Sequence, residues 1–251
     1  NGSQMFTECE PGTFQPEQGQ YQCIAASPGN ASWGFGRTSQ LPCSLGFFQP
    51  NYSSSSCIKA EIGFFVDSIG SAEQQQCPEN TTTTGRTSTS ANHCISKSGF
   101  YIDSFGKSLP CQLGTFQPDM GQDKCIEASP GFYVDANGSS LQFPCQDGTF
   151  NPNPSSTSET DCQFSQPGYI VNSNNSAELP CPAGKYQPTL GGLQCIGTDP
   201  GFYSPSVGKA EQIPCTPGEF QPMPNSVQCE TADAGYYTDS ISATSQIPCN
   251  I

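Results

Sequence analysis

Residues 9–23 read CEPGTFQPEQGQYQC, and residues 181–195 repeat the pattern as CPAGKYQPTLGGLQC. Both segments open and close on cysteine and carry the motif Cys-x-x-Gly-x-aromatic-Gln-Pro. A motif that returns at a fixed period indicates a repeat architecture and decides the fold of the whole chain. The spacing of the cysteines therefore predicts how the chain is organised.

The cysteines that open these segments recur every 34 residues, with a single interval of 36. They are Cys9, Cys43, Cys77, Cys111, Cys145, Cys181, Cys215 and Cys249. This period predicts an N-terminal extension at 1–8, seven repeats, and the start of an incomplete eighth repeat at 249–251. The repeats are 9–42, 43–76, 77–110, 111–144, 145–180, 181–214 and 215–248.

Each repeat also has a second half, which keeps the glycine and the aromatic residue but lacks cysteine. One such half begins at Ala128, contains Gly131, Phe132 and Tyr133, and ends at Gln142. The segments 26–40, 60–74, 128–142, 198–212 and 232–246 all begin with Ala or Thr and end with Gln 14 positions later, the same separation as between the cysteines of 9–23. Each repeat is therefore predicted to contain two half-repeats of about 17 residues, a cysteine half-repeat and a cysteine-free half-repeat.

The joint presence or loss of both cysteines indicates how they pair. If the two cysteines of one half-repeat are bonded to each other, losing both leaves no orphan thiol. The predicted pairs are Cys9–Cys23, Cys43–Cys57, Cys77–Cys94, Cys111–Cys125, Cys145–Cys162, Cys181–Cys195 and Cys215–Cys229. The alternative joins each closing cysteine to the next opening one, because spacing alone does not settle connectivity.

Cys249 is expected to be unpaired in this chain, because it opens a further cysteine half-repeat. Its partner is expected about 14 residues further on in a longer protein, or on another subunit.

Composition predicts a disulfide-rich fold of small β or irregular repeats rather than one large core. Only 33% of the chain is hydrophobic, and it contains 26 Gly and 23 Pro. We expect an elongated, solenoid-like rod in which each half-repeat forms a hairpin-like unit. A disulfide that closes such a loop contributes about 3 kcal/mol, so contacts between neighbouring half-repeats must supply the rest. Doubled aromatic residues such as Phe132 and Tyr133 are predicted to compensate for the missing disulfide.

Three segments depart from the motif. The half-repeat after Cys23 has Asn30 and Ala31 where others have aromatic residues, followed by Trp33. The segment 77–94 is three residues longer and lacks the glycine and the aromatic residue, and the Pro- and Ser-rich stretch 151–161 is predicted to form a protruding loop.

Fifteen cysteines predict an oxidising compartment, so the chain is expected to be secreted, extracellular or at the cell surface. The first residues have no signal-peptide pattern, and we expect a leader to lie upstream or to have been removed. A net charge of −14 with only 8 Lys and Arg disfavours binding to nucleic acid or anionic membranes. No apolar run is long enough to predict membrane insertion.

The sequence does not predict an enzyme, a metal site or a cofactor. The single histidine, His93, adjoins Cys94, which the repeat assigns to a disulfide, and no Cys-x-x-Cys motif is present. Calcium is an alternative for the recurring Asp67, Asp103, Asp135 and Asp239. Each is isolated, whereas calcium takes six to eight oxygens, so we expect these side chains to cap their own turns.

N-linked glycosylation is predicted at six Asn-x-Ser/Thr sequons. They are Asn1, Asn30, Asn51, Asn80, Asn137 and Asn174. The serines at 53–56 and the threonines at 81–84 are candidates for O-linked sugar.

The motif of 9–23 and 181–195, with its Cys-x-x-Gly-x-aromatic core and closing cysteine, resembles the ephrin-receptor-like cysteine-rich repeat. That resemblance covers nearly the whole chain and implies an extracellular module found in animal receptors and in surface proteins of algae and other protists. It implies a role in adhesins or in appendages such as flagellar hairs.

We therefore expect a structural subunit of a glycosylated extracellular filament or surface coat. Its expected partners are copies of itself, other extracellular proteins and glycans. The alternative is a spacer or recognition ectodomain of a larger receptor or adhesin.

Overall fold

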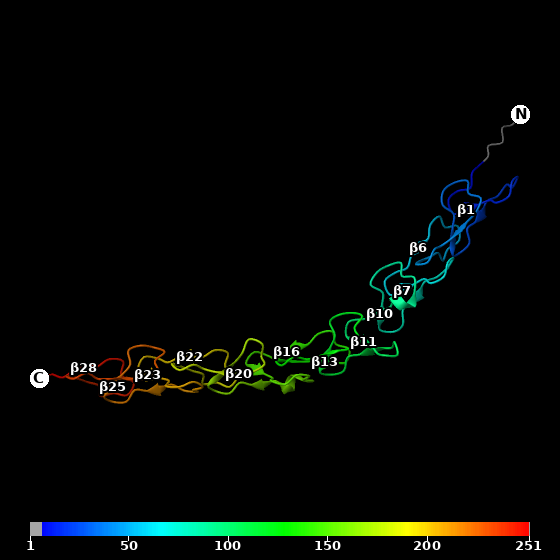
Figure 1. Cartoon of the computed structure of the whole chain (residues 1–251). Coiled ribbons are helices and arrows are strands. Elements are labelled where there is room, and N and C mark those ends of the chain that lie inside the picture. Colours follow the sequence, from blue (N-terminus) through cyan, green and yellow to red (C-terminus); the bar gives the residue numbers. More distant parts are fainter. Residues whose placement is uncertain (1–6, 251) are drawn as a thin grey trace. The chain divides into compact units, whose positions relative to one another are not determined.

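The computed structural model describes residues 7–250, in which the regular structure is fourteen two-stranded antiparallel sheets and two short 3-10 helices (Figure 1). No α-helix occurs in that range. The predicted class of small, disulfide-rich β repeats is confirmed. Contacts divide the chain into two compact units. The first comprises the described residues up to Pro110 with Gln117–Cys125, and the second comprises Cys111–Phe116 with the described residues from Ile126 on.

The first unit contains six hairpins. They pair β1 (Thr13–Phe14) with β2 (Ile24–Ala25), β3 (Asn30–Ala31) with β4 (Leu41–Pro42), β5 (Phe47–Phe48) with β6 (Ile58–Lys59), β7 (Phe64–Phe65) with β8 (Gln75–Gln76), β9 (Thr81–Thr82) with β10 (Ile95–Ser96), and β11 (Phe100–Ile102) with β12 (Ser108–Pro110). The 3-10 helix η1 (Ala91–His93) precedes β10.

The second unit contains eight hairpins. They pair β13 (Thr115–Phe116) with β14 (Ile126–Glu127), β15 (Phe132–Tyr133) with β16 (Phe143–Pro144), β17 (Thr149–Phe150) with β18 (Gln163–Phe164), β19 (Tyr169–Val171) with β20 (Glu178–Pro180), β21 (Lys185–Tyr186) with β22 (Ile196–Gly197), β23 (Phe202–Tyr203) with β24 (Ile213–Pro214), β25 (Glu219–Phe220) with β26 (Glu230–Thr231), and β27 (Tyr236–Tyr237) with β28 (Ile247–Pro248). The 3-10 helix η2 (Glu159–Asp161) precedes β18.

Each hairpin is one half-repeat, and the residue that opens the half-repeat lies in the core. Cys43, Ala60, Cys181 and Thr198 are all at most 1% exposed. The available space accepts only a small side chain, which explains why Ala, Ser or Thr stands where cysteine is lost. The core of each unit is thus a column of small side chains, not a cluster of large ones.

Successive half-repeats are joined by three backbone hydrogen bonds that recur along both units. The half-repeat glycine and the residue three positions later each donate to the following half-repeat, and a turn residue of that half-repeat donates back. Between 26–40 and 43–57 the bonds are Gly29 N to Gln49 O (2.7 Å), Ser32 N to Ser54 O (3.0 Å) and Ser53 N to Ala26 O (2.9 Å). Between 181–195 and 198–212 they are Gly184 N to Ser204 O (2.9 Å), Gln187 N to Lys209 O (3.1 Å) and Gly208 N to Cys181 O (2.8 Å).

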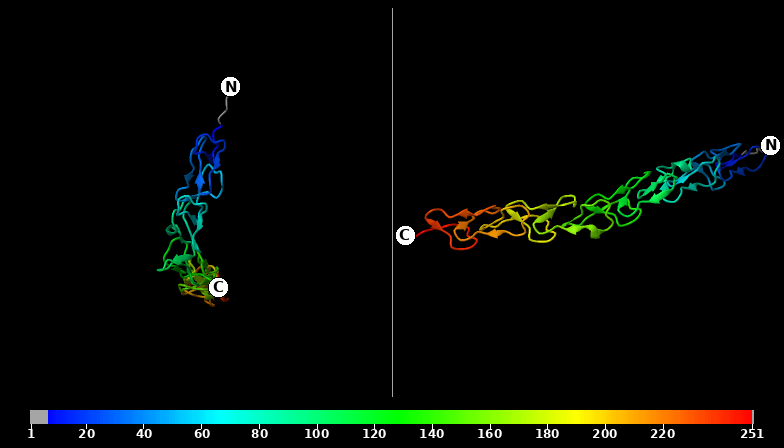
Figure 2. Two further views of the ribbon diagram at one scale, coloured as in Figure 1. Left: turned by 90° about the vertical axis from the view of Figure 1, so that its right-hand side faces the viewer. Right: turned by 60° about the horizontal axis from the view of Figure 1, so that its bottom comes forward.

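A second contact links most half-repeats to the next but one, through the glycine at their start. Gly29 has φ +81°, and a Cβ atom there would lie 2.0 Å from the carbonyl oxygen of Gly70. The corresponding glycine of a cysteine half-repeat, Gly12, would meet the carbonyl oxygen of Ser53 at the same distance. Cysteine half-repeats therefore contact cysteine half-repeats, and cysteine-free ones contact cysteine-free ones. In the right-hand view of Figure 2 the hairpins of each unit follow one another in sequence order.

Candidate functional site

The cysteine half-repeats are closed by disulfides between their own first and last cysteines. The bonds are Cys9–Cys23, Cys43–Cys57, Cys77–Cys94, Cys145–Cys162, Cys181–Cys195 and Cys215–Cys229. Their Cα atoms are 5.5 to 5.8 Å apart, which is common disulfide geometry. Cys111 and Cys125 are disulfide-bonded as well, and Cys249 is free and exposed. Cys23 and Cys43 belong to different bonds, so the alternative pairing does not occur.

Five of the cysteine-free half-repeats are closed by a glutamine side chain at the place of the second cysteine, and in the one after Cys162 the carboxylate of Glu178 accepts from Gln166 N at 3.0 Å instead. Gln74 Oε1 accepts a hydrogen bond of 2.8 Å from the backbone N–H of Glu61, directly after Ala60. The same bond joins Gln40 to Ser27 N (2.7 Å), Gln142 to Ser129 N (2.8 Å), Gln212 to Asp199 N (2.8 Å) and Gln246 to Asp233 N (2.7 Å). Sequence reasoning found this glutamine but missed its bond.

The glutamine of the Gln-Pro motif closes the turn inside the cysteine half-repeats. Gln49 is 5% exposed, and its Nε2 donates to Ser56 O (2.7 Å) while its Oε1 accepts from Asn51 N (3.0 Å). Gln117 and Gln221 make the same two bonds in their own half-repeats. The glutamine of the Gln-Pro motif therefore has a structural role in these half-repeats.

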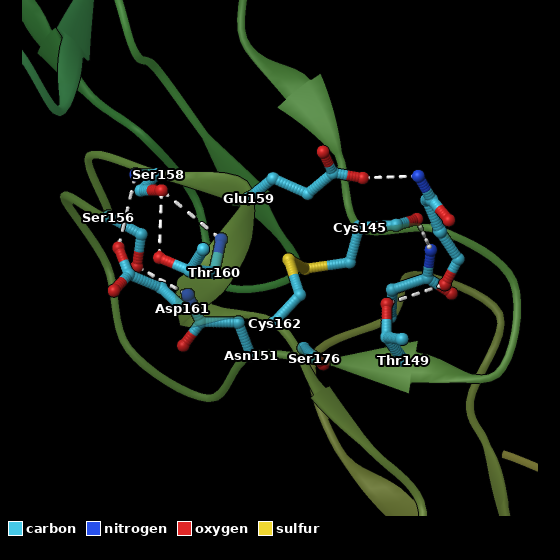
Figure 3. Close-up of a disulfide and its surroundings, with 12 residues drawn as sticks. Cys145, Thr149, Asn151, Ser156, Ser158, Glu159, Thr160, Asp161, Cys162 and Ser176 are labelled. Carbon is cyan, nitrogen blue, oxygen red and sulfur yellow. Dashed lines mark hydrogen bonds between the residues drawn. A yellow bond between two sulfur atoms is a disulfide. The ribbon is translucent and has the colours of Figure 1, made fainter.

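Two cysteine half-repeats are three residues longer than the others, and both place the extra residues in a 3-10 helix before the closing cysteine. Figure 3 shows this for Cys145–Cys162, where Ser158 caps η2. The hydroxyl of Ser158 accepts from Thr160 N, and the carboxylate of Asp161 accepts from Ser158 N at 3.1 Å. Helix η1 ends beside Cys94 in the same way.

The prediction of a protruding loop at 151–161 was wrong, because this segment folds into the array. Asn151 is 1% exposed, and its side chain donates to the hydroxyl of Ser156. The carbonyl oxygen of Ser156 accepts from Val134 N (2.9 Å), and Ser155 N donates to Ala128 O (2.8 Å). These are the regular bonds between half-repeats, so the segment packs like any other turn.

Two of the four candidate calcium carboxylates are held in local hydrogen bonds. Asp103 Oδ1 accepts from the backbone N–H groups of Phe105 and Lys107, both at 2.9 Å. Asp67 Oδ1 accepts from the side chain of Gln75 at 3.0 Å. Within residues 7–250 no three His, Cys, Asp or Glu side chains gather into a metal site.

The histidine and one tyrosine are the remaining titratable groups of interest. His93 lies at the end of η1, and its Nδ1 accepts from Thr89 N at 3.4 Å. The pKa of Tyr133 is raised above its ordinary value, first by desolvation and then by the carboxylates of Glu159 and Asp135. Its ring lies 5.9 Å from that of Phe143, across the same hairpin.

The sequons divide into exposed and half-buried sites. Asn51, Asn137 and Asn174 are exposed. Asn30 lies in β3, is half-buried, and donates through Nδ2 to Ser27 Oγ and Pro28 O, both at 3.2 Å. Asn80 is also half-buried. The sequon at Asn1 lies outside the described residues.

Large apolar side chains are exposed at the turn of many half-repeats, nine positions after the first residue. Their exposed fractions range from 47% for Met120 to 93% for Phe105. These tip residues are Phe35, Tyr52, Ile69, Phe105, Met120, Leu190, Val207 and Ile241. Asn137 and Asn174 occupy the same position in two other half-repeats.

Comparison with curated proteins finds similarity to "Signal peptide, CUB and EGF-like domain-containing protein 2" from three animals. The human protein is 30% identical over 95 residues, which is 37% of this chain and 8% of the relative. The Mus musculus and Danio rerio proteins are 30% and 31% identical over 97 residues, which is 39% of this chain and again 8% of each relative. The matched part is thus a small share of those proteins, and no protein-family model matches the chain.

Together, the disulfides and this similarity identify the chain as an extracellular cysteine-rich repeat array. In the part of the chain that the structure describes, no helix has the length and apolar character needed to cross a bilayer.

Proposed function

We propose that the chain is a structural subunit of a glycosylated extracellular filament or surface coat and associates with copies of itself. The kinship of its repeat with the ephrin-receptor-like repeat is part of this proposal. The observation that carries it is the row of exposed apolar tip residues, which recur at one position of the repeat.

The tip residues favour self-association because they are large, apolar and regularly placed. Ile69, Val207 and Ile241 are each more than 60% exposed, although nothing in the fold of their own half-repeat requires an apolar residue there. Exposed apolar side chains that recur on a surface are typical of protein interaction sites. Only 12% of the residues are charged, so few charges would have to be desolvated when two copies meet.

The contacts between half-repeats support a structural role. Most half-repeats bond to their neighbours through the same backbone groups, so an array of this kind can be lengthened without any new type of contact. We also propose that the chain has no catalytic activity. Its Gln, Asn and Asp side chains are largely engaged in closing turns, as those of Gln49 and Asp103 show.

The test is the association state of the purified protein. Sedimentation velocity and negative-stain microscopy should show concentration-dependent oligomers or filaments. The triple variant Ile69→Ser, Val207→Ser, Ile241→Ser should shift the protein to monomer. A matched control, Gln18→Ser with Arg86→Ser, changes polar residues at the same repeat position and should leave assembly intact. Monomers at every concentration would contradict the proposal.

A spacer or recognition ectodomain of a larger receptor or adhesin is the second candidate. It is supported by the relatives, in which the similar region makes up only 8% of a longer protein. Isolated, unassembled molecules in the same micrographs would favour it. Its expected partners are other extracellular proteins or glycans.

A further inference from the structure

The contact between like half-repeats is interrupted in the first unit beside the irregular segment 77–94. A Cβ on Gly29 or Gly46 would meet a backbone carbonyl oxygen at 2.0 or 2.5 Å. On Gly63 the nearest atom would be Thr82 Oγ1 at 3.8 Å, and on Gly106 nothing lies within 4 Å. Packing between the half-repeats on either side of 77–94 is therefore looser than elsewhere in this unit.

Two hollows open at this place. One has a volume of about 550 Å³ and is lined by Ile62, Phe64 and Lys97 among others. The other has a volume of about 590 Å³ and is lined by Ile95, Ile102 and Lys107 among others. Both are bordered by the same residues of the irregular segment, Pro78, Glu79, Asn80 and Thr81. Volumes of about 300–1,000 Å³ are typical of sites that hold a small molecule.

The hollows arise because polar residues replace the usual motif. Asn80 stands at the glycine position, and Thr82 stands at the second strand position, which the other cysteine half-repeats fill with an aromatic side chain such as Phe14. Asn80 has φ +59°, the left-handed conformation that asparagine adopts more readily than most residues. A side chain now projects where glycine has none, and one aromatic ring is missing beside it.

Asn80 is placed to carry a modification into this space. It forms the sequon Asn80-Thr81-Thr82 and borders both hollows. Its carbonyl oxygen accepts from Lys97 N (3.0 Å) and Ser108 Oγ (3.2 Å), which fixes the backbone. Its side-chain amide makes no hydrogen bond to any residue that the structure describes. The amide of Asn30, by contrast, is engaged twice.

The first hollow combines an aromatic wall with polar groups, which suits a pyranose ring. A sugar has an apolar face that can stack on an aromatic ring and an edge of hydroxyl and amide groups that need hydrogen bonds. Phe64 supplies the ring, and Glu79, Lys97 and Thr82 supply polar partners around it.

We propose that the first N-acetylglucosamine of an N-linked glycan on Asn80 packs in the hollow over Phe64. There it stabilises the half-repeat in place of the missing aromatic side chain. This inference rests on the glycosylation included in the proposed function. Glycans on Asn51, Asn137 and Asn174, at exposed turns, have no such packing role.

The test compares sequon variants in protein secreted from cells that make only high-mannose glycans. Asn80→Gln and Thr82→Ala remove the sequon, whereas Thr82→Ser keeps it. Asn51→Gln removes a glycan at an exposed turn, where the asparagine side chain makes no hydrogen bond to any residue that the structure describes. The first two should lower the earliest thermal transition by about 2–4 °C, and the other two should leave it unchanged. Endoglycosidase H, which leaves one N-acetylglucosamine on each asparagine, should not lower it either.

Two controls separate the outcomes. In unglycosylated protein that is produced in bacteria and refolded, the Thr82→Ala and Thr82→Ser variants should have the same earliest thermal transition temperature. Glycopeptide mass spectrometry then reports occupancy at each sequon. If Asn80 is occupied but its removal changes stability no more than Asn51→Gln, the packing inference is overturned while the glycosylation in the proposed function stands. An unoccupied Asn80, or sugar on Thr81 or Thr82 in its place, also overturns it. If no sequon is occupied, the glycosylation in the proposed function fails as well.

Discussion

The half-repeats 43–57 and 60–74 are neighbours with the same hairpin fold, yet they are closed by different chemistry. The first is closed by the bond Cys43–Cys57, and the second by a hydrogen bond from Glu61 N to the side chain of Gln74. Both bury their opening residue, and both donate to a backbone carbonyl of the next half-repeat from the same position, Gln49 N to Ser71 O (3.1 Å) and Val66 N to Ser88 O (2.9 Å).

This comparison separates what sets the fold from what stabilises it. The shared features are the positive-φ glycine, the two-residue strand pair and the bonds to neighbouring half-repeats, so these define the hairpin. The disulfide is present in only one of the two, and it acts mainly by restricting the unfolded chain.

The largest expected effect comes from replacing the positive-φ glycine, a feature that both kinds of half-repeat share. Gly29→Ala would place a Cβ 2.0 Å from the carbonyl oxygen of Gly70, in a conformation that is already unfavourable for alanine. We expect a loss of about 4 kcal/mol, measured by urea denaturation with the fluorescence of Trp33, the only tryptophan.

Gly19→Ala is the matched control for this substitution. Gly19 has φ +78°, close to that of Gly29, but no atom lies within 4 Å of the position that an added Cβ would occupy. Only the conformational cost of about 1–2 kcal/mol should remain. Equal losses for the two variants would show that the contact between like half-repeats is not important.

Converting a cysteine half-repeat into the other kind should have the next largest effect. Cys43→Ala with Cys57→Ala removes a closed loop and should cost about 3 kcal/mol. Cys43→Ala with Cys57→Gln restores the glutamine closure and should recover about 1 kcal/mol of that loss. Thermal denaturation of both variants measures the difference, and identical midpoints would argue against a stabilising role for the glutamine.

Removing the glutamine closure from a cysteine-free half-repeat should have a smaller effect. Gln142→Leu deprives Ser129 N of its acceptor, and because this bond is exposed, water can take the place of the side chain in part. We expect a loss of about 1 kcal/mol and faster amide hydrogen exchange at Ser129. Unchanged exchange would contradict the role assigned to Gln142.

The smallest effect concerns pH and Tyr133, which lies in the same half-repeat as Gln142. Because its pKa is raised in the folded protein, the unfolded chain loses the proton first as the pH rises. The associated stability is present below the unfolded pKa of about 10 and is lost above it. Tyr133→Phe should therefore reduce the fall in stability between neutral pH and a pH of about 11. An unchanged slope would contradict this assignment.

The pattern of the cysteines was enough to predict the hairpin repeats, because the residues that form each short strand pair and close each loop recur at a fixed spacing in the sequence. It was not enough to predict the role of Gln74, since a side chain that bonds to a nearby backbone N–H leaves only a regular spacing without a chemical signature. The contact between Gly29 and Gly70 could not be predicted, because it joins half-repeats that are not adjacent in the sequence. Doubled aromatic residues remain a predicted, untested source of stability, and the ring pair of Tyr133 and Phe143 lies within one hairpin.

The central claim is that both kinds of half-repeat are one hairpin with interchangeable closures. Introducing Ala60→Cys and Gln74→Cys tests it most directly, because it places two cysteines where the neighbouring half-repeat has them. The account predicts a new disulfide, seen as the loss of two titratable thiols relative to the reduced variant, and a gain of up to about 3 kcal/mol. Two free thiols in the oxidised, folded protein, or a bond from either new cysteine to Cys43 or Cys57, would contradict it.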